Sequence, residues 1–373
     1  MIEEYTHRVE ALQKQIATAR LDAFLVTATD SIYYLTGLRY EPFERVFFLL
    51  VRPEGEIEVV TPRIEAENMG TIPVQHRIVE YTDYPAPAGE TYLDALASVL
   101  KQTERVGVEP TMEAQLLSAL GDWGPEVVPL IERLRLVKSR TEILQIEKAA
   151  HYSDLGLRMV MDAAKTGTSV QSGYDCIPAL RKAIEDGEGR LDQYTSSIWL
   201  GAWASPFSAQ PHRFPEPSDM YGPGPIVGLS FLRVNGYSAE TERTFFVEKP
   251  AAEEAEVFET MRAACAIAYE RLRPGVSAHD VDHAVMTFLR REGFGDNLLH
   301  RTGHGIGMGG HEGPWVAEGS DDILAENMVI SVEPGIYWRG EGGYRHSDTV
   351  LITEDGYRKL TEFSDTLDAM TLA

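Results

Sequence analysis

The first stretch that could do chemistry places two carboxylates two positions apart. Glu240 and Glu242 lie within residues 236–245, a segment with the composition of a β-strand. Because alternate side chains of a strand face the same side, we expect both carboxylates to project together. A solvated strand face would give the same pattern, so this stretch by itself does not distinguish a site from a surface.

A second stretch places two histidines around a glycine-rich turn. His304 and His311 lie within residues 303–314, where glycine recurs at almost every second position. Glycine allows a backbone to pass close to a ligand or to another strand. A lone histidine is more often structural than functional, whereas a pair framed by glycines favours a functional site.

The third and fourth stretches supply another carboxylate and a cation. Residues 328–332, apolar except for Ser331, run directly into Glu333, and residues 342–349 include Arg345. A glutamate at the end of a buried strand needs a partner, a proton or a cation. These stretches therefore predict that Glu333 reaches a cleft.

Three glutamates in one cleft require compensation for their charge. If Glu240, Glu242 and Glu333 converge, they cannot all stay ionised without it. A bound metal ion, shared protons or a cationic ligand would each supply it, and so would a neighbouring Arg243 or Arg345. The residues alone leave these alternatives open.

The elements that must position these residues fall into two groups along the chain. In the first, a hairpin is expected where two apolar runs flank Pro53, Glu54 and Gly55. The expected helices and strands alternate, which predicts a three-layer α/β domain. The expected segments are a helix at 7–20, a strand at 23–27, a helix at 31–37, and hairpin strands at 47–51 and 57–61.

The second group begins with a helical segment that starts near residue 131. Ser139 or Thr141 would cap a long helix that ends near Met161. The other expected segments are helices at 253–272 and 277–292, and strands at 226–231, 237–247, 328–332 and 349–353. We place the domain boundary at the start of the helical segment, which gives domains of residues 1–132 and 133–373.

Composition limits the classes of partner. The chain has 373 residues, a net charge of −24 and only two cysteines, Cys176 and Cys265. A field of this sign repels a phosphate backbone, so nucleic acid is not an expected partner. The chain has no apolar run long enough to span a membrane, and two cysteines fit a reducing, cytoplasmic setting.

Taken together, these stretches resemble the pita-bread hydrolases, which include prolidase, aminopeptidase P and creatinase. Residues 303–314 resemble that family's "GHGIG…HE.P" signature, and residues 333–348 resemble its "EPG(I/L)Y…GG(I/V)R" signature. Residues 34–37 and 138–139 match its two-domain branch. The resemblance implies an α/β chain: an α+β pita-bread C-terminal domain preceded by a smaller, three-layer, creatinase-type N-terminal domain.

The resemblance also implies a reduced metal site. The family's peptidases use five ligands in the order Asp, Asp, His, Glu, Glu. The positions that keep a ligand here are Glu240, His304 and Glu333, whereas Leu229 and Ser347 replace the other two. Leucine cannot coordinate a cation and a neutral serine is a poor ligand. The expected cofactor is therefore one divalent ion, zinc or manganese, or none.

By the same resemblance, the other residues take catalytic and binding roles. His311, Glu333 and Glu242 are the expected catalytic residues, and His212 and Arg345 are expected to bind substrate. Glu242 begins a Glu-Arg-Thr sequence that resembles creatinase, the metal-free branch of the family.

Three functions follow. The leading one is a hydrolase of an amide or other C–N bond in a small polar substrate, similar to an Xaa-Pro dipeptidase. The alternatives are a metal-free, creatinase-like amidino or amide hydrolase, in which His212 moves protons, and a non-enzymatic binding protein on the same fold. The resemblance also implies a homodimer, with a small molecule or dipeptide as partner and neither nucleic acid nor membrane.

Overall fold

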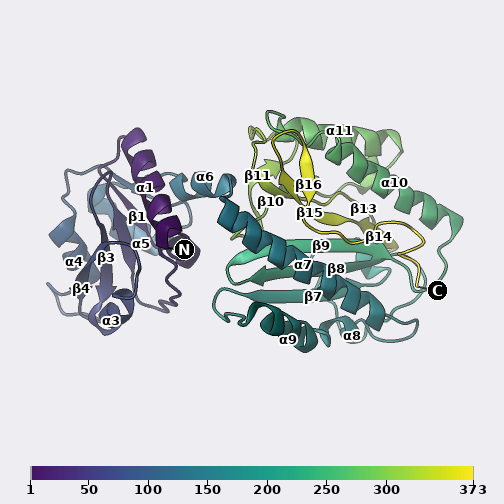
Figure 1. The fold of residues 1–373 in the computed structure, drawn as a ribbon, viewed down its shortest axis with the longest axis horizontal. Helices are drawn as coiled ribbons and strands as arrows, with labels where there is room; N and C mark the ends of the chain where they lie inside the picture. The colour runs from purple at the N-terminus through teal and green to yellow at the C-terminus, as the bar shows by residue number, and fades with distance from the viewer. Residues whose placement is uncertain (1, 373) are drawn as a thin grey trace. The chain divides into compact units, whose positions relative to one another are not determined.

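A computed structural model describes residues 2–372 of the chain. Its contacts divide the chain into two compact units, Met1–Arg135 and Leu136–Ala373, each of which is described by itself (Figure 1). None of the described helices is long and apolar enough to cross a membrane.

Unit 1 contains a six-stranded mixed sheet in the order β4-β3-β2-β1-β5-β6. All four residues of β1 are buried, so both faces of the sheet are covered, as the three-layer prediction requires. The hairpin is confirmed, because β2 and β3 pair antiparallel. The strands are β1 Ala23–Val26, β2 Phe48–Val51, β3 Ile57–Pro62, β4 His76–Tyr81, β5 Val106–Val108 and β6 Glu126–Val127. The helices are α1 Ile2–Thr18, α2 Thr29–Thr36, α3 Ala66–Met69, α4 Tyr92–Val99 and α5 Ala114–Ala119.

The helical segment expected from residue 131 is two helices, α6 Leu130–Leu136 and α7 Arg140–Ala163. Of the two predicted caps for α7, the structure selects Ser139. Its side chain accepts a hydrogen bond from the backbone N–H of Glu142, whose carboxylate accepts one from the N–H of Ser139. This capping box sets the start of α7 and ends the connection from α6.

Unit 2 contains an eight-stranded sheet whose main path is β11-β10-β12-β15-β9-β8-β7, with β16 paired to β15. The strands are β7 Ser197–Trp203, β8 Ile226–Val234, β9 Tyr237–Phe245, β10 Gly303–Gly305, β11 Glu312–Val316, β12 Val329–Val332, β15 Ser347–Ile352 and β16 Tyr357–Lys359. A separate hairpin pairs β13 Gly335–Trp338 with β14 Gly342–Arg345. The helices after α7 are α8 Gln171–Tyr174, α9 Ile177–Glu188, α10 Ala252–Tyr269 and α11 Ala278–Arg291.

The hairpin of β8 and β9 sets the register of the site. Asn235 and Gly236 both have positive φ, at 48° and 103°, which is the conformation of a tight turn that suits the twist of two strands. The turn pairs Leu229 with Glu242 and Phe231 with Glu240. Directly opposed residues share a face, so these four side chains lie on one face of the sheet.

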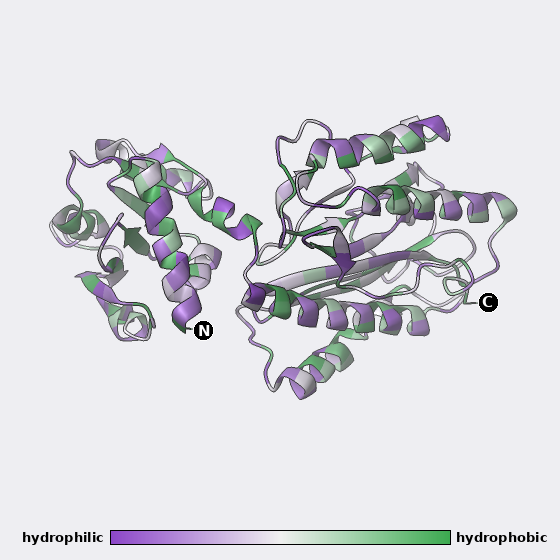
Figure 2. Ribbon diagram, turned by 45° about the horizontal axis from the view of Figure 1, so that its top comes forward, coloured by the Kyte–Doolittle hydropathy of each residue, from purple (hydrophilic) through white to green (hydrophobic). Residues whose placement is uncertain are grey.

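Helix α7 covers the opposite face. Ser153 of α7 donates a hydrogen bond to the carbonyl of Ser230, and Thr241 donates to Asp154. Gly156 lets the helix approach closely, since a Cβ there would collide with Ser230 and Leu200. Polar and apolar residues alternate along α7, as expected for a helix with one face against the sheet (Figure 2).

Candidate active site in the second unit

One pocket of about 590 Å³ gathers the predicted residues on the face of the sheet away from α7. Glu240 and Glu242 are each only 4% exposed and both line it, so the expectation that they project together is confirmed. The other predicted residues that line it are His212, Leu229, His311, Glu333 and Arg345. Segments separated by more than a hundred positions therefore meet in one cleft.

His304 lies between two of the carboxylates. Its Nε2 is 3.2 Å from Oε1 of Glu333 and 3.7 Å from Oε1 of Glu240. Its Nδ1 is 2.9 Å from the carbonyl oxygen of Gly305, which makes Nδ1 the donor nitrogen and directs Nε2 at the two acids. Strand β10 holds His304 opposite Ser331 of β12, two positions before Glu333. The end of β12 thus brings Glu333 to the cleft as expected.

His311 meets His304 through the glycine-rich segment between β10 and β11. The two imidazole rings stack with centroids 3.9 Å apart. The next residue, Glu312, accepts a hydrogen bond from the backbone N–H of Gly309 and pairs with Lys138 at 3.0 Å. The glycines are required here, because a Cβ on Gly307 would press on both Glu312 and Lys138. The turn therefore folds back and returns His311 to the site.

Arg345 is the arginine that compensates a site carboxylate. Its Nε lies 2.5 Å from Oε2 of Glu242, and both side chains are almost fully buried. Arg243 does not face the pocket; it pairs with Asp348 at 2.8 Å on the other face of the sheet. Of the two arginines that the sequence left open, Arg345 is therefore the one that neutralises Glu242.

Burial and neighbouring charges shift the acidity of the group. Burial raises the pKa of Glu242 to about 8, although Arg345 opposes that shift. Burial also raises the pKa of Glu240. For His304, burial is outweighed by the carboxylates of Glu333 and Glu240, which raise its pKa, and His304 in turn lowers the pKa of Glu333. Burial and the charge of His304 lower the pKa of His311 to about 4. A neutral His311 beside an ionised Glu333 is a suitable arrangement for hydrolysis at neutral pH.

The two positions where the family has further ligands are filled differently. Leu229 presents an apolar side chain to the pocket, and Ser347 donates a hydrogen bond to Oε1 of Glu240 at 2.9 Å. Ser331 also donates to Oε1 of Glu240. Two hydroxyl groups therefore solvate this buried carboxylate where the family's fifth ligand would lie.

The remaining donors fit one ion. Among the described residues, donor atoms of Glu240, His304 and His311 all lie within 4.8 Å of one another. His304 has the orientation typical of a ligand histidine, with one ring nitrogen hydrogen-bonded to a carbonyl and the other directed at the acids. Leu229 and Ser347 add no strong donor, so the set suits one divalent ion and not two.

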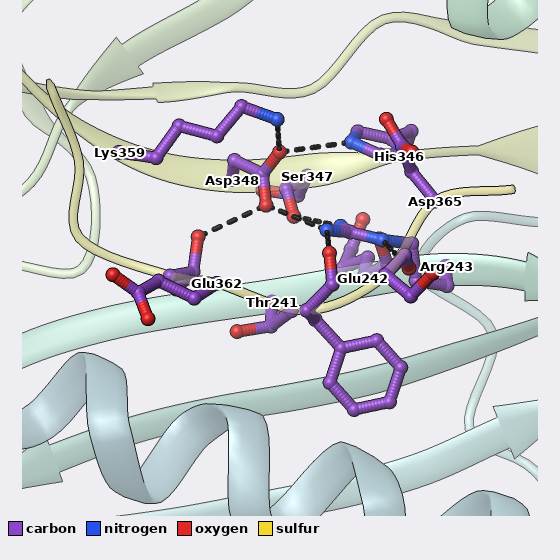
Figure 3. A network of polar contacts seen from close by, with 12 residues as sticks. Thr241, Glu242, Arg243, His346, Ser347, Asp348, Lys359, Glu362 and Asp365 are labelled. Atoms are coloured by element: carbon purple, nitrogen blue, oxygen red, sulfur yellow. Dashed lines mark hydrogen bonds and ion pairs between the residues drawn. The ribbon is translucent and has the colours of Figure 1, made fainter.

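His346 and Asp348 lie outside the site. Asp348 pairs with Thr241 on the face that α7 covers. It accepts hydrogen bonds from His346, Lys359 and Arg243 in a buried network (Figure 3). Neither residue can therefore join an ion at Glu240 without a shift of register.

Several residues in or directly behind the pocket wall were not singled out from the sequence. Ser331 could have been found, because it precedes Glu333 by two positions and so shares its face. His300 accepts a hydrogen bond from the hydroxyl of Tyr337 and lies beside Arg301 in the pocket wall. His300, Arg301 and Trp203 gave no signal in the sequence, because their positions depend on how distant loops pack.

Comparisons with known proteins agree with this architecture. Residues 145–354 match metallopeptidase family M24, and residues 8–137 match the creatinase/prolidase N-terminal domain. The chain belongs to metallopeptidase family M24. The pita-bread resemblance, the fold class and the expectation of a hydrolase family are thus confirmed.

Relatives in the M24 family match the chain over nearly its whole length. An uncharacterized peptidase of Staphylococcus aureus is 28% identical over 358 residues, which cover 95% of this chain and 99% of the relative. A recombinant prolidase from Thermococcus sibiricus has a TM-score of 0.85 at 25% identity and covers 96% of this chain and 97% of its own. The dipeptidase PepE from Mycobacterium ulcerans has a TM-score of 0.85 at 26% identity, with 98% of each chain covered.

Proposed function

We propose that this M24 protein hydrolyses an amide bond in a small substrate, an Xaa-Pro dipeptide or a similar compound, with at most one divalent ion. The observation that supports the proposal is the convergence of Glu240, His311 and Glu333 in one pocket, with the buried His304 in contact with all three. Prolidase and dipeptidase are the printed names of the two solved structures compared above, which supports the substrate class.

The ion, zinc or manganese, would be held by Glu240 and His304, with Glu333, which contacts His304 at 3.2 Å, as the third ligand and His311 within reach. When bound, such an ion lowers the pKa of water and polarises a carbonyl. Glu333 is the proposed general base, because its carboxylate reaches the pocket beside His304 and can accept a proton from water there. His311 lies beside this pair, where it steadies the reacting carbonyl.

His212 and Arg345 are proposed to bind the substrate. His212 is exposed in the pocket wall, whereas Arg345 is buried and already paired with Glu242. An anionic group of the substrate that approaches Arg345 therefore competes with Glu242. Release of Glu242, with its raised pKa, would supply a second acid near the scissile bond.

The creatinase-like alternative uses the same pocket without an ion. His304 can itself compensate Glu333, which it contacts at 3.2 Å, and the hydroxyl groups of Ser331 and Ser347 donate hydrogen bonds to Glu240. In that version His212 moves the proton, and Glu242 and Glu333 hold a cationic substrate. The ion pair of Glu242 with Arg345 weighs against it, because Glu242 is not free to bind a cation.

The test is hydrolysis of a set of Xaa-Pro dipeptides by the full chain, with and without added Mn²⁺ or Zn²⁺. We expect turnover that depends on the ion and falls at least roughly a hundredfold in Glu333→Gln. The matched control is Glu326→Gln, at a position in the loop before β12. Turnover of guanidino compounds without metal would support the creatinase-like version, and specific ligand binding with no turnover of either class would support a binding protein.

A homodimer and a cytoplasmic setting also remain proposals. The two free cysteines, Cys176 and Cys265, are compatible with a reducing compartment. Light scattering of the purified chain after gel filtration would give twice the mass of one chain if the dimer forms.

A further inference from the structure

The pocket extends from the acids onto an apolar platform of two strands. On β7 the residues that share the pocket face are Trp199, Gly201 and Trp203. They pair across the ladder with Phe231, Leu229 and Val227 of β8. Gly201 has no side chain, and the rings of Tyr174 and Trp203 lie over it, so the surface between the two tryptophans is lined by aromatic groups. Strand β9, which carries Glu240 and Glu242, pairs with β8 and so lies next to the platform.

The platform is held in place before any ligand binds. The indole N–H of Trp203 donates a hydrogen bond to the carbonyl of Arg213 at 2.6 Å. The ring of Phe231 packs so tightly against Gly310 that a Cβ there would collide with it. A rigid aromatic wall loses little conformational entropy when a ligand binds to it.

Apolar surface is left unpartnered at the rim of the platform. Trp199 is 53% exposed, and Leu299 and Phe214 are 60% and 76% exposed, and all three line the pocket. Large apolar side chains that are exposed to solvent around a pocket with some polar groups are typical of a ligand site. The platform therefore favours a ligand that has a large apolar group.

A cation with no acidic partner lies in the same pocket. Arg301 donates through Nε to the carbonyl of Gly303 at 3.0 Å, and its guanidinium lies over the ring of Trp315. Within residues 2–372 its terminal nitrogens have no carboxylate within ion-pair distance, whereas Arg345 and Arg213 in the same pocket are paired with Glu242 and Asp219. Arg301 is thus the pocket arginine available to an anionic ligand.

We propose that the substrate is an amphipathic anion: an amide with a large apolar or aromatic group, which lies on the platform of Trp199, Phe231 and Leu229, and a carboxylate, which pairs with Arg301. This deepens the proposed function and rests on it only for the identity of the bond that is broken. Leu229 is then a specificity residue, because it extends the apolar surface to the edge of the acids.

Binding of simple probes tests the two halves separately. The probes are 3-phenylpropionate, which has the ring and the carboxylate, propionate, which has no ring, and 3-phenylpropan-1-ol, which has no charge. None has an amide bond, so the readout is affinity by calorimetry and not turnover. We expect 3-phenylpropionate to bind the full chain at least about tenfold more tightly than either of the other two.

Variants assign the two contacts. Trp199→Ala should weaken binding of both ring compounds at least about fivefold. Arg301→Gln should weaken 3-phenylpropionate about tenfold and the alcohol less than about twofold, and Arg301→Lys should restore part of the loss. Arg181→Gln, an exposed arginine of α9 outside the pocket, is the matched control and should change nothing.

Equal affinity for 3-phenylpropionate and propionate would overturn the proposal. The proposal would also be overturned if Trp199→Ala and Arg301→Gln, both melting at the wild-type temperature, bound the probes with unchanged affinity. Binding of the probes without hydrolysis of any dipeptide would refute the proposed function and leave this inference standing. Hydrolysis of dipeptides with no preference for those that carry a large apolar ring would refute this inference and leave the proposed function standing.

Discussion

The buried ion pair of Lys138 and Glu312 makes a quantitative prediction about the loop that returns His311 to the site. The side chain of Lys138 is 1% exposed and that of Glu312 is 12% exposed. Lys138→Met removes the ammonium that pairs with Glu312 in this buried site. Loss of one member of a buried pair typically costs about 3–5 kcal/mol.

The double variant separates the pair from its members. Glu312→Gln should cost a similar amount, because it leaves the ammonium of Lys138 unpaired. If the pair is the cause, Lys138→Met with Glu312→Gln should cost less than the sum of the two by at least about 2 kcal/mol. Lys182→Met is the control, because its pair with Asp186 is exposed and should contribute little to stability.

Urea unfolding followed by tryptophan fluorescence is the assay. Four of the five tryptophans, at positions 199, 203, 315 and 338, lie in unit 2, and the fifth is Trp123 in unit 1. The signal therefore reports mainly on the unit that contains the pair. Additive effects of the two single changes, within about 0.5 kcal/mol, would refute the reasoning.

Two further predictions concern the buried network behind the site. Asp348→Asn should lower the free energy of unfolding by about 3–5 kcal/mol, because it leaves Arg243 and Lys359 without their anion, whereas Asp355→Asn on the surface should change it little. Burial and then the charge of Arg243 lower the pKa of His346 to about 4. The unfolded chain therefore binds a proton that the folded chain does not between pH 6.5 and 4, so stability falls as pH falls through that window. His346→Gln should remove on the order of 1–3 kcal/mol of this loss in melts recorded at pH 7 and pH 4.5. An identical pH profile for the variant would contradict the assignment.

The parts of the site that depend on local pattern could be predicted from the sequence. Strand alternation placed Glu240 and Glu242 on one face, and an apolar run that ends in an acid placed Glu333 at the cleft. The capping residue of α7 stayed open between Ser139 and Thr141, because both positions suit a cap and only the hydrogen bond with Glu142 decides between them.

Tertiary packing decided what local pattern could not. Strand alternation already sends Arg243, the residue after Glu242, to the opposite face, whereas the contact of Arg345 with Glu242 depends on how β14 packs against β9. Arg301 and the platform on β7 are absent from the predicted site, because nothing in residues 197–203 indicates which strand they pair with. The expected segment boundaries were otherwise within a few residues, and the largest difference is at the helix expected at 7–20, which begins at Ile2.

The coordination capacity of the pocket is tested most directly by counting ions. Protein stripped with a chelator and titrated with Mn²⁺ or Zn²⁺ in a calorimeter should bind one ion per chain, and His304→Ala should abolish that binding. Leu229→Asp together with Ser347→Glu should raise the number toward two. Two ions per wild-type chain, or one ion whose binding survives His304→Ala, would contradict a single site at Glu240, His304 and Glu333.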